Sequence, residues 1–317
     1  MKGLRLVPEE TNFNFIGLRY IAYVISALLI VGSISVTFKN GLNFGIDFTG
    51  GTVIEIRTPE ATDLGDLRTL LNELDLGAIS IQEFGAPNDL LIRLPQQEGD
   101  AEVQQMAIED VRQTLDDAYA EVGEVDYRRV EFVGPQVGEE LKRQGMLAVL
   151  FSMIGILAYV WFRFEWQFGV ASIVALLHDA IATIGLFALT QMEFNLSTVA
   201  AILMIAGYSI NDTVIVFDRI RENLRKFKKM PLPELFNNSV NQMLGRTLMT
   251  SGTTLLALLA LYVFGGEVIQ GFIYALIFGI IIGTYSSVFV AAPVLLNTGL
   301  KRAEVQSADQ APQASSS

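Results

Sequence analysis

The chain contains no cysteine and only one histidine, and just 18% of its 317 residues are charged. Without cysteine, disulfide scaffolds, thiol catalysis and Cys-ligated metal sites are excluded. An average soluble domain is about 25% charged, so the scarcity of charge argues against a soluble enzyme. The sequence also lacks a P-loop, a nucleophile–base pair and a metal-binding cluster in its polar part. An enzyme with its own hydrolytic site is therefore the poorest interpretation, and we expect no cofactor and no metal.

Acidic residues are concentrated in one region of the chain. Residues 39–143 hold 22 Asp and Glu against 9 Lys and Arg, whereas the rest of the chain holds 12 acidic and 13 basic residues. About a hundred residues are thus acidic and water-soluble. The remainder, in a chain that is 51% hydrophobic overall, is a lipid-soluble frame. A nucleic-acid binder would carry a basic face instead, so nucleic acid is excluded as a partner.

Long apolar runs predict an integral membrane protein, because about 20 apolar residues are enough to span a bilayer as a helix. The sequence has six such runs, at 18–38, 145–162, 168–189, 196–217, 248–264 and 269–296. The first could be a cleaved signal peptide, since Ser33 and Ser35 imitate a small-x-small cleavage site. Its apolar run is longer than the usual core of about 7–15 residues, which favours an uncleaved anchor.

Lys and Arg in the short loops predict the orientation of the six spans. The loop after the fourth run carries six Lys and Arg within eleven positions, whereas the loops after the third and fifth runs carry Glu193 and Glu267 and no basic residue. Further basic residues flank the same side, at Lys2, Arg5, Arg19, Arg163, Lys301 and Arg302. We therefore expect both termini (1–17 and 297–317) and the basic loop (218–247) in the cytoplasm, and residues 39–143 outside. Lys142 and Arg143 count against this orientation.

The segment that follows the basic loop and the end of the chain have distinct patterns. Pro233 begins a predicted interfacial helix, which places a set of apolar side chains on one side: Leu235, Phe236, Val240 and Met243. Such a helix would lie on the cytoplasmic lipid surface. Residues 306–317 are polar and rich in Ala, Ser and Gln, and we expect them to be disordered.

The acidic segment has its own pattern of secondary structure. Alternating residues predict strands at 52–57, 79–84, 90–94 and 127–133, with a turn at 85–88, and helical periodicity predicts helices at 64–74 and 100–121. The order β-α-β-β-α-β is the split βαβ, or ferredoxin-like, arrangement. The predicted fold class is therefore a six-helix membrane protein with an α+β domain between its first two spans. Because this fold supports many functions, it assigns no chemistry.

Ionisable side chains inside a membrane span are costly and are functional by default. The third run carries His178 and Asp179, the fourth carries Asn211 and Asp212, and Arg246 lies at the start of the fifth. Asp179, Asp212 and Arg246 each share a helical face with small and hydroxyl-bearing residues, where other helices or water must lie. Two interpretations stay open: an ion pair that locks the bundle, or a proton site governed by the approach of Arg246 to Asp212. For His178 alone we favour a neutral imidazole bonded to a helix carbonyl or hydroxyl.

The sixth run carries small residues at every fourth position: Gly271, Ala275, Gly279, Gly283 and Ser287. Such a ladder permits close approach of helix backbones. Close helix packing is the interpretation we favour, and a sliding contact with a partner stays open. Together with the hydroxyl-rich faces of the fourth and fifth runs, the ladder is too extensive to leave against lipid. We therefore expect the chain to need the helices of a partner.

Four stretches resemble the SecF branch of the SecD/SecF family, in the resistance-nodulation-division (RND) superfamily. They are F-G-I-D-F-T-G-G at 44–51, L-H-D at 177–179, G-Y-S-I-N-D-T-V-I-V-F-D-R-I-R-E at 207–222 and R-T-L-M-T-S-G at 246–252. The third stretch is the most specific, although Gly207 stands where many relatives have another small residue. The motifs occur in family order, and the resemblance covers about residues 11–301.

The resemblance implies an accessory subunit of the Sec preprotein translocase in the bacterial inner membrane, driving late-stage export with the proton-motive force. It implies SecD as a separate chain, and contact through the complex with SecYEG, SecA, YajC, the translocating preprotein and membrane lipid. Asp212 and Arg246 match proton-pathway positions of the family, and we group Asn211, Asp179 and His178 with them. For residues 44–51 a simple glycine turn and a coupling hinge stay open. The hinge would involve Gly45, Asp47, Gly50 and Gly51.

Two other functions remain open. Half of an RND-type exporter of small molecules or lipids would share the same membrane frame. That class usually has a second large external loop, whereas the loop after the third run has only about six residues. A non-transporting assembly scaffold, whose ion pair is purely structural, is the other alternative. Proton-dependent activity in vesicles would separate the scaffold from the two transport functions.

Overall fold

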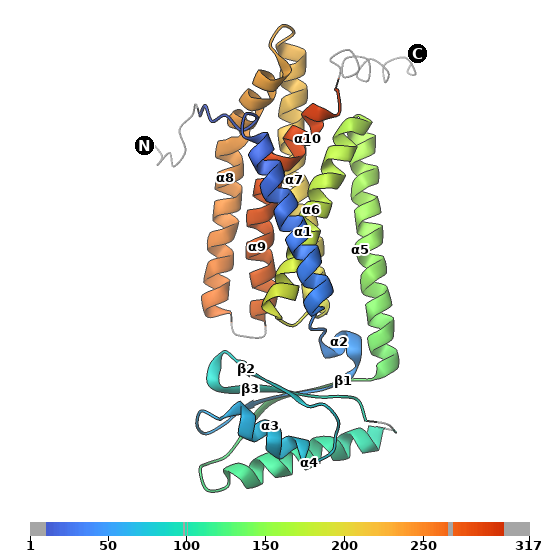
Figure 1. The fold of residues 1–317 in the computed structure, drawn as a ribbon, viewed down its shortest axis with the longest axis vertical. Coiled ribbons are helices and arrows are strands. Elements are labelled where there is room, and N and C mark those ends of the chain that lie inside the picture. The colour runs from blue at the N-terminus through green and yellow to red at the C-terminus, as the bar shows by residue number, and fades with distance from the viewer. Residues whose placement is uncertain (1–10, 98, 100, 266–268, 301–317) are drawn as a thin grey trace, which may run out of the picture. The chain divides into compact units, whose positions relative to one another are not determined.

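The computed structural model describes residues 11–97, 99, 101–265 and 269–300 and shows two compact units (Figure 1). The helical unit lies within Met1–Asn43, Ala148–Met192 and Ser197–Ser317, and the α+β unit comprises Phe44–Leu147 together with Glu193–Leu196. Several predictions concern residues outside the described part: the orientation signals at Lys2, Arg5, Glu267, Lys301 and Arg302 and the disordered tail.

Among the described residues, six helical segments are long and apolar enough to cross a membrane, as predicted. They are α1 (Arg19–Asn40), α5 (Pro135–Arg163), α6 (Trp166–Thr190), α7 (Leu196–Lys226), α8 (Leu232–Phe264) and the consecutive segments α9 (Gln270–Ser286), η2 (Ser287–Ala291) and α10 (Ala292–Asn297). Helices α5, α7 and α8 are much longer than the predicted spans. Hydropathy locates only the part of a helix that suits lipid, whereas the backbone hydrogen bonds continue beyond it.

Helices α6, α7 and α9 form the interior of the helical unit. More than half of the apolar stretch of each is buried within the chain, whereas only about a tenth is buried in α1, α5 and α8. The largest fully buried side chains of this unit are Phe168, Phe187, Phe217, Phe236 and Ile220. The outer helices therefore present their apolar side chains to lipid or to another chain.

The sixth span is not a single uninterrupted α-helix. Ser287–Ala291 forms a π-helical turn, and Pro293 follows in the first turn of α10. Proline has no backbone N–H, and its ring crowds the carbonyl group four residues earlier. A wider turn just before Pro293 relieves this crowding. Such turns are frequent at functional sites.

The segment after the basic loop differs from the predicted separate interfacial helix. Helix α8 begins at Leu232 and continues without a break to Phe264. Leu235, Phe236 and Val240 do share one face, but that face is buried in the protein core. An apolar stripe on a helix suits a lipid surface and a protein core equally well, so the sequence pattern could not distinguish the two.

The α+β unit is built on a four-stranded antiparallel sheet with strand order β2-β3-β1-β4. A short helix, α2 (Ile46–Thr49), precedes the predicted succession β1 (Gly51–Arg57), α3 (Leu64–Asn72), β2 (Ser80–Phe84), β3 (Ala86–Leu94), α4 (Ala101–Tyr119) and β4 (Asp126–Val133). Strands β2 and β3 turn at Gly85, whose φ is 89°. The turn is therefore tighter than predicted, since β3 already begins at Ala86.

Alternation along the strands gives the sheet two different faces. One face carries Ile54, Ile56, Leu90, Ile92 and Leu94, which pack against Leu67 and Leu71 of α3 and Val111 and Leu115 of α4. On the other face, Val53 and Leu91 contact Ile46 of α2. Arg93, two residues after Leu91, lies on this second face as well.

A buried carboxylate organises the charges on this second face. Asp89 is 1% exposed, and both of its oxygens accept hydrogen bonds of 2.6 Å from Arg57. A guanidinium nitrogen of Arg128 lies 3.4 Å from Oδ1 of Asp89. The hydrogen bonds from Arg57 outweigh the effect of burial and hold the pKa of Asp89 below its usual value.

Asp89→Asn should destabilise the α+β unit by roughly 2–3 kcal/mol, because it removes two charge-assisted hydrogen bonds from a buried group. The native state favours the ionised carboxyl, so this stabilisation is present above the unfolded pKa and is lost as pH falls through the lower folded pKa. Hydrogen exchange of the β1 and β3 amides in the full chain measures the effect. Glu131→Gln, which removes an exposed ion pair with Arg129, is the control and should cost less than about 0.5 kcal/mol. Equal costs for the two variants would contradict this account.

Candidate functional site

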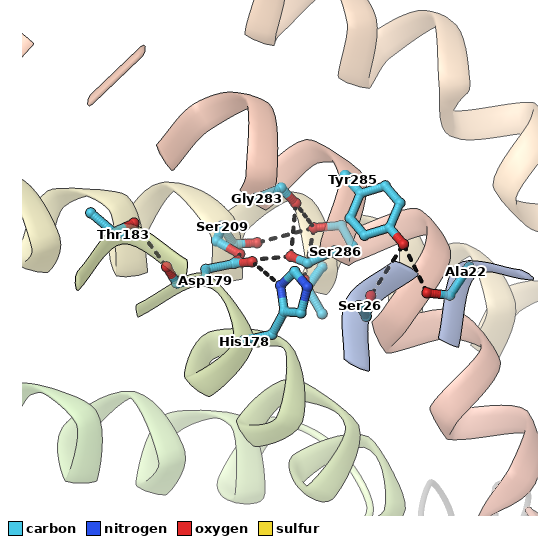
Figure 2. A network of polar contacts seen from close by, with 11 residues as sticks. Ala22, Ser26, His178, Asp179, Thr183, Ser209, Gly283, Tyr285 and Ser286 are labelled. Carbon is cyan, nitrogen blue, oxygen red and sulfur yellow. Dashed lines mark hydrogen bonds and ion pairs between the residues drawn. The ribbon is translucent and has the colours of Figure 1, made fainter. Parts of the chain in front are cut away.

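A cluster of buried polar residues in the helical unit surrounds Asp179 of α6, which is 1% exposed (Figure 2). Its Oδ2 accepts hydrogen bonds from Ser209 of α7 at 2.5 Å and from Ser286 of α9 at 2.7 Å. Its Oδ1 lies 2.9 Å from Nδ1 of His178. A single carboxylate therefore joins α6 to the next helix, α7, and to α9 near the end of the chain.

His178 pairs with this carboxylate rather than with the helix carbonyl or hydroxyl that was predicted. The ring is 4% exposed, and its Nε2 has no hydrogen-bond partner among the described residues. The ring centre lies 5.9 Å from that of Tyr285. The Tyr285 hydroxyl donates to the carbonyl of Ala22 at 3.0 Å and lies 3.1 Å from Oγ of Ser26. Tyr285 thus contacts the His178 ring and forms hydrogen bonds with α1, as Figure 2 shows.

A second layer of hydrogen bonds lies one turn farther along α7. Ser287, the first residue of the π-helical turn, donates to the carbonyl of Gly283 at 2.9 Å. Oγ1 of Thr213 lies 2.9 Å from Oγ of Ser287. Either hydroxyl could be the donor in this contact. The first layer connects α7 with the end of α9, and the second connects α7 with the start of η2.

Asp212 comes directly before Thr213 on α7 and is 2% exposed. Its Oδ2 is buried and has no hydrogen-bond partner among the described residues. An ionised carboxylate without a partner is costly away from water. Asp212 therefore requires a nearby positive charge or a bound proton.

Two interpretations of Asp212 and Arg246 were left open, an ion pair and a proton site. No ion pair joins Arg246 of α8 to Asp212 in the described part of the chain, although its charge acts on that carboxylate. The Arg246 side chain is exposed. It lines an open cavity of about 150 Å³ with Ile215, Asp218, Arg219, Glu222 and Met243. A closed Asp–Arg lock is therefore not the observed arrangement.

Further polar side chains lie on the surface of α7 and α8. Asn211 is exposed, as are Thr250 and Thr253 on the same face as Arg246. Polar groups on a membrane helix are seldom left against lipid. We expect protein or water, rather than acyl chains, to cover this surface.

The small-residue ladder packs within the chain. A Cβ atom on Gly279 would overlap the side chain of Ile205 on α7, and one on Gly283 would lie 3.1 Å from Cβ of Ser209. Ala275 is fully buried, and a Cβ on Gly271 would lie 3.9 Å from the Met192 side chain. The ladder thus permits the close approach of α9 to α7, and these contacts leave little of it for a partner.

The glycine-rich motif at 44–51 leads into the sheet. Gly50 and Gly51 have φ values of 70° and 110°, a region that side chains rarely adopt. A Cβ on Gly51 would also lie 2.5 Å from the carbonyl oxygen of Leu94. Turn geometry therefore explains both glycines, and a hinge at this motif stays a prediction.

The sequence pattern indicated Asp179, His178 and Asp212 as candidate site residues. It did not indicate that Ser286, Tyr285 and Thr213 lie next to them. Hydroxyl-bearing residues are common in membrane helices, so each one alone carries little signal. One signal was available: Ser286 and Ser287 form a polar pair at the end of the small-residue ladder.

Two family profiles match the chain. The profile for the protein export membrane protein SecD/SecF, C-terminal, matches residues 114–301, and the profile for the SecD/SecF GG motif matches residues 36–58. The protein translocase subunit SecF of Rickettsia bellii is 46% identical, covering 92% of this chain and 95% of that protein. SecF of Magnetococcus marinus is 47% identical, covering 92% and 94%, and SecF of Cereibacter sphaeroides is 45% identical, covering 94% and 93%.

Solved structures show the same likeness. The crystal structure of SecDF, a translocon-associated membrane protein from Thermus thermophilus, superposes with a TM-score of 0.83 at 38% identity, covering 93% of this chain and 40% of that chain. SecDF in a super-membrane-facing form gives a TM-score of 0.67 with 95% and 40% coverage. The chain thus spans about two fifths of these SecDF chains but nearly the full length of the SecF subunits. It belongs to the SecD/SecF family of protein-export membrane proteins, in the SecF branch.

Proposed function

We propose that this chain works with a SecD-type partner to drive late-stage protein export with the proton-motive force. The observation that carries the proposal is Asp212, a buried carboxylate in a membrane helix whose Oδ2 has no hydrogen-bond partner among the described residues. A group of this kind can take up a proton from one side of the membrane and release it to the other. Hydrolysis by the chain itself is not part of the proposal.

Arg246 governs the proton affinity of Asp212 in this mechanism. When the guanidinium approaches, it favours the ionised carboxylate, and when it withdraws, it favours the protonated form. The exposed side chain of Arg246 and the open cavity beside it leave room for this movement. No closed ion pair joins the two residues in the described part of the chain. This arrangement supports a gated proton site over an ion pair that locks the helices.

Asp179 and His178 form an inner proton-binding pair next to this site. Ser209, three residues before Asp212 on α7, donates to Asp179. Binding of a proton at Asp179 would weaken that contact, because a neutral carboxyl is a poorer acceptor than a carboxylate. Protonation of Asp179 would thus change a contact of α7, the helix that carries Asp212.

We place the helices of SecD against the exposed polar side chains of α7 and α8, which are Asn211, Arg246, Thr250 and Thr253. The 40% coverage of SecDF chains supports a partner that supplies the remaining helices. Through the complex, the chain would contact SecYEG, SecA, YajC and the translocating preprotein. We propose the bacterial inner membrane as its location, with both termini in the cytoplasm and the α+β unit, as a ferredoxin-like domain, outside.

The available energy is sufficient for a two-state movement. One charge that crosses about 100 mV releases about 2.3 kcal/mol. This free energy changes an equilibrium between two conformations by nearly fiftyfold, since about 1.4 kcal/mol is a factor of ten. A small number of protons per cycle is therefore enough to drive a mechanical step.

Export into inverted vesicles tests the proposal. Vesicles with the native complex are compared with vesicles that lack this chain, each with and without a protonophore, while the late stage of preprotein entry is followed at constant ATP. We expect the chain to increase the amount of exported preprotein several-fold and the protonophore to remove this increase, which we call the protonophore-sensitive increment. An increment that survives the protonophore unchanged would contradict proton coupling and favour the scaffold alternative.

A further inference from the structure

The segment Glu193–Leu196 connects α6 with α7 in the sequence but belongs to the α+β unit. The backbone of Phe194 pairs with the glycine-rich motif: its carbonyl accepts a hydrogen bond of 3.0 Å from Gly45 N–H, and it forms a parallel bridge with Phe44. The Phe194 ring centre lies 5.8 Å from that of Phe44 and 6.2 Å from that of Phe48.

Asp47 of α2 binds the beginning of α7. Its Oδ2 accepts a hydrogen bond of 2.9 Å from the backbone N–H of Leu196, the first residue of that helix. The first N–H groups of a helix have no partner within the helix. A carboxylate at this end both satisfies one of them and complements the helix dipole. Asp47 thus acts as a cap that comes from another part of the chain.

Arg93 of β3 binds the same segment through Glu193. The two side chains form an ion pair of 2.6 Å, with Arg93 12% exposed and Glu193 27% exposed. The Glu193 carboxylate lies against Gly45, where a Cβ atom would overlap it. The glycine at this position of the motif is therefore explained by the space that Glu193 occupies.

We call these contacts the α7 clasp: Asp47 with Leu196, Arg93 with Glu193, and Gly45 with Phe194. All three lie inside the α+β unit. The main core of the sheet does not depend on them, since its members all lie between Ile54 and Val130. The clasp therefore lies outside that core.

We propose that the α7 clasp couples the proton site to the α+β unit, an inference that rests on the proposed function. Asp212 lies sixteen residues after Leu196 on one continuous helix, which is about 24 Å at about 1.5 Å per residue. A helix is stiff along its axis, so a shift or rotation at Asp212 reaches Leu196. The clasp then passes this movement to α2 and β3. Asp47, Arg93 and Glu193 are positioning residues, and none of them handles a proton.

Exchange of the two charges tests the coupling. Arg93→Glu and Glu193→Arg each break the ion pair, and the double variant restores it in reverse. In the vesicle assay we expect each single variant to reduce the protonophore-sensitive increment at least fivefold, while protonophore-insensitive export and the amount of assembled complex stay unchanged. The double variant should recover the increment to within twofold of wild type. A purely structural pair would affect both parts of export together.

Two further variants make the test specific. Arg129→Glu breaks an exposed pair with Glu131 on the same sheet and should leave the increment unchanged. Glu193→Gln keeps the shape of the side chain but removes its charge. It replaces the charge-reversal variants if either of them prevents assembly of the complex, and it should reduce the increment about threefold. Hydrogen exchange of the first-turn amides of α7 in the purified complex should rise at least tenfold in the single variants and recover in the double variant.

The outcomes separate the two proposals. A wild-type complex without a protonophore-sensitive increment overturns the proposed function and, with it, the coupling. A wild-type increment that persists unchanged in the single variants overturns the coupling alone. Single variants that lose the increment without recovery in the double variant also overturn it, because the loss would then not depend on the ion pair.

Discussion

Asp212→Asn should abolish the protonophore-sensitive part of export, a loss of at least tenfold in that increment, and leave assembly of the complex intact. The amide has nearly the same shape as the carboxyl group, so it fits a site that is only 2% exposed. It cannot bind and release a proton, so the energy of the proton gradient no longer reaches the chain. Removing an unpartnered buried carboxylate also removes a desolvation cost. We therefore expect the variant to fold at least as well as wild type.

The control is Glu234→Gln in the first turn of α8. Glu234 is exposed and does not line the cavity beside Arg246. It should change neither the increment nor the yield of the complex. The comparison is made in the vesicle assay with matched amounts of each complex. If Asp212→Asn retains the full protonophore-sensitive increment, the coupling proton binds elsewhere and Asp212 has only a structural role.

Gly279→Leu should prevent correct packing of α7 against α9. A Cβ atom alone already overlaps Ile205 at this position, and a leucine adds three more carbons. Overpacking of a tight core typically costs about 1–3 kcal/mol, and more where neither backbone can move. Here the displaced helix also carries Ser209, so its contact with Asp179 should be lost. We expect the yield of assembled complex to fall at least fivefold, measured by co-purification with the partner.

Gly155→Leu provides the matched control. Gly155 is also a glycine in a membrane helix, but nothing lies within 4 Å of a Cβ placed there. The substitution raises helix propensity and adds apolar surface on an exposed side of α5. It should leave yield and export unchanged. Equal losses for the two variants would show that the loss at Gly279 does not come from its contact with Ile205.

The membrane helices and the sheet could be predicted because their signals are periodic and local. Long apolar runs predicted all six spans of the described chain, and alternation such as Val53–Ile54–Glu55–Ile56 predicted β1. Charge inside an apolar run was sufficient to identify Asp179 and Asp212, since such residues are rarely placed there without a reason.

The partners of those residues could not be predicted, because they depend on helix packing. The sequence pattern left open whether Asp212 and Arg246 form an ion pair or a proton site, and it gave no sign of the hydrogen bonds from Ser209 and Ser286 to Asp179. These depend on the rotation of α6, α7 and α9 about their axes, which hydropathy does not determine. The α7 clasp could not be predicted for a similar reason, because in the sequence Glu193 is only an acidic residue in a short loop.

The two serines that converge on Asp179 make the two oxygens of its carboxyl group unequal. Oδ2 lies within hydrogen-bond distance of the hydroxyl groups of Ser209 and Ser286, whereas Oδ1 faces Nδ1 of His178. One oxygen therefore joins α6 to α7 and α9, and the other contacts the only imidazole of the chain.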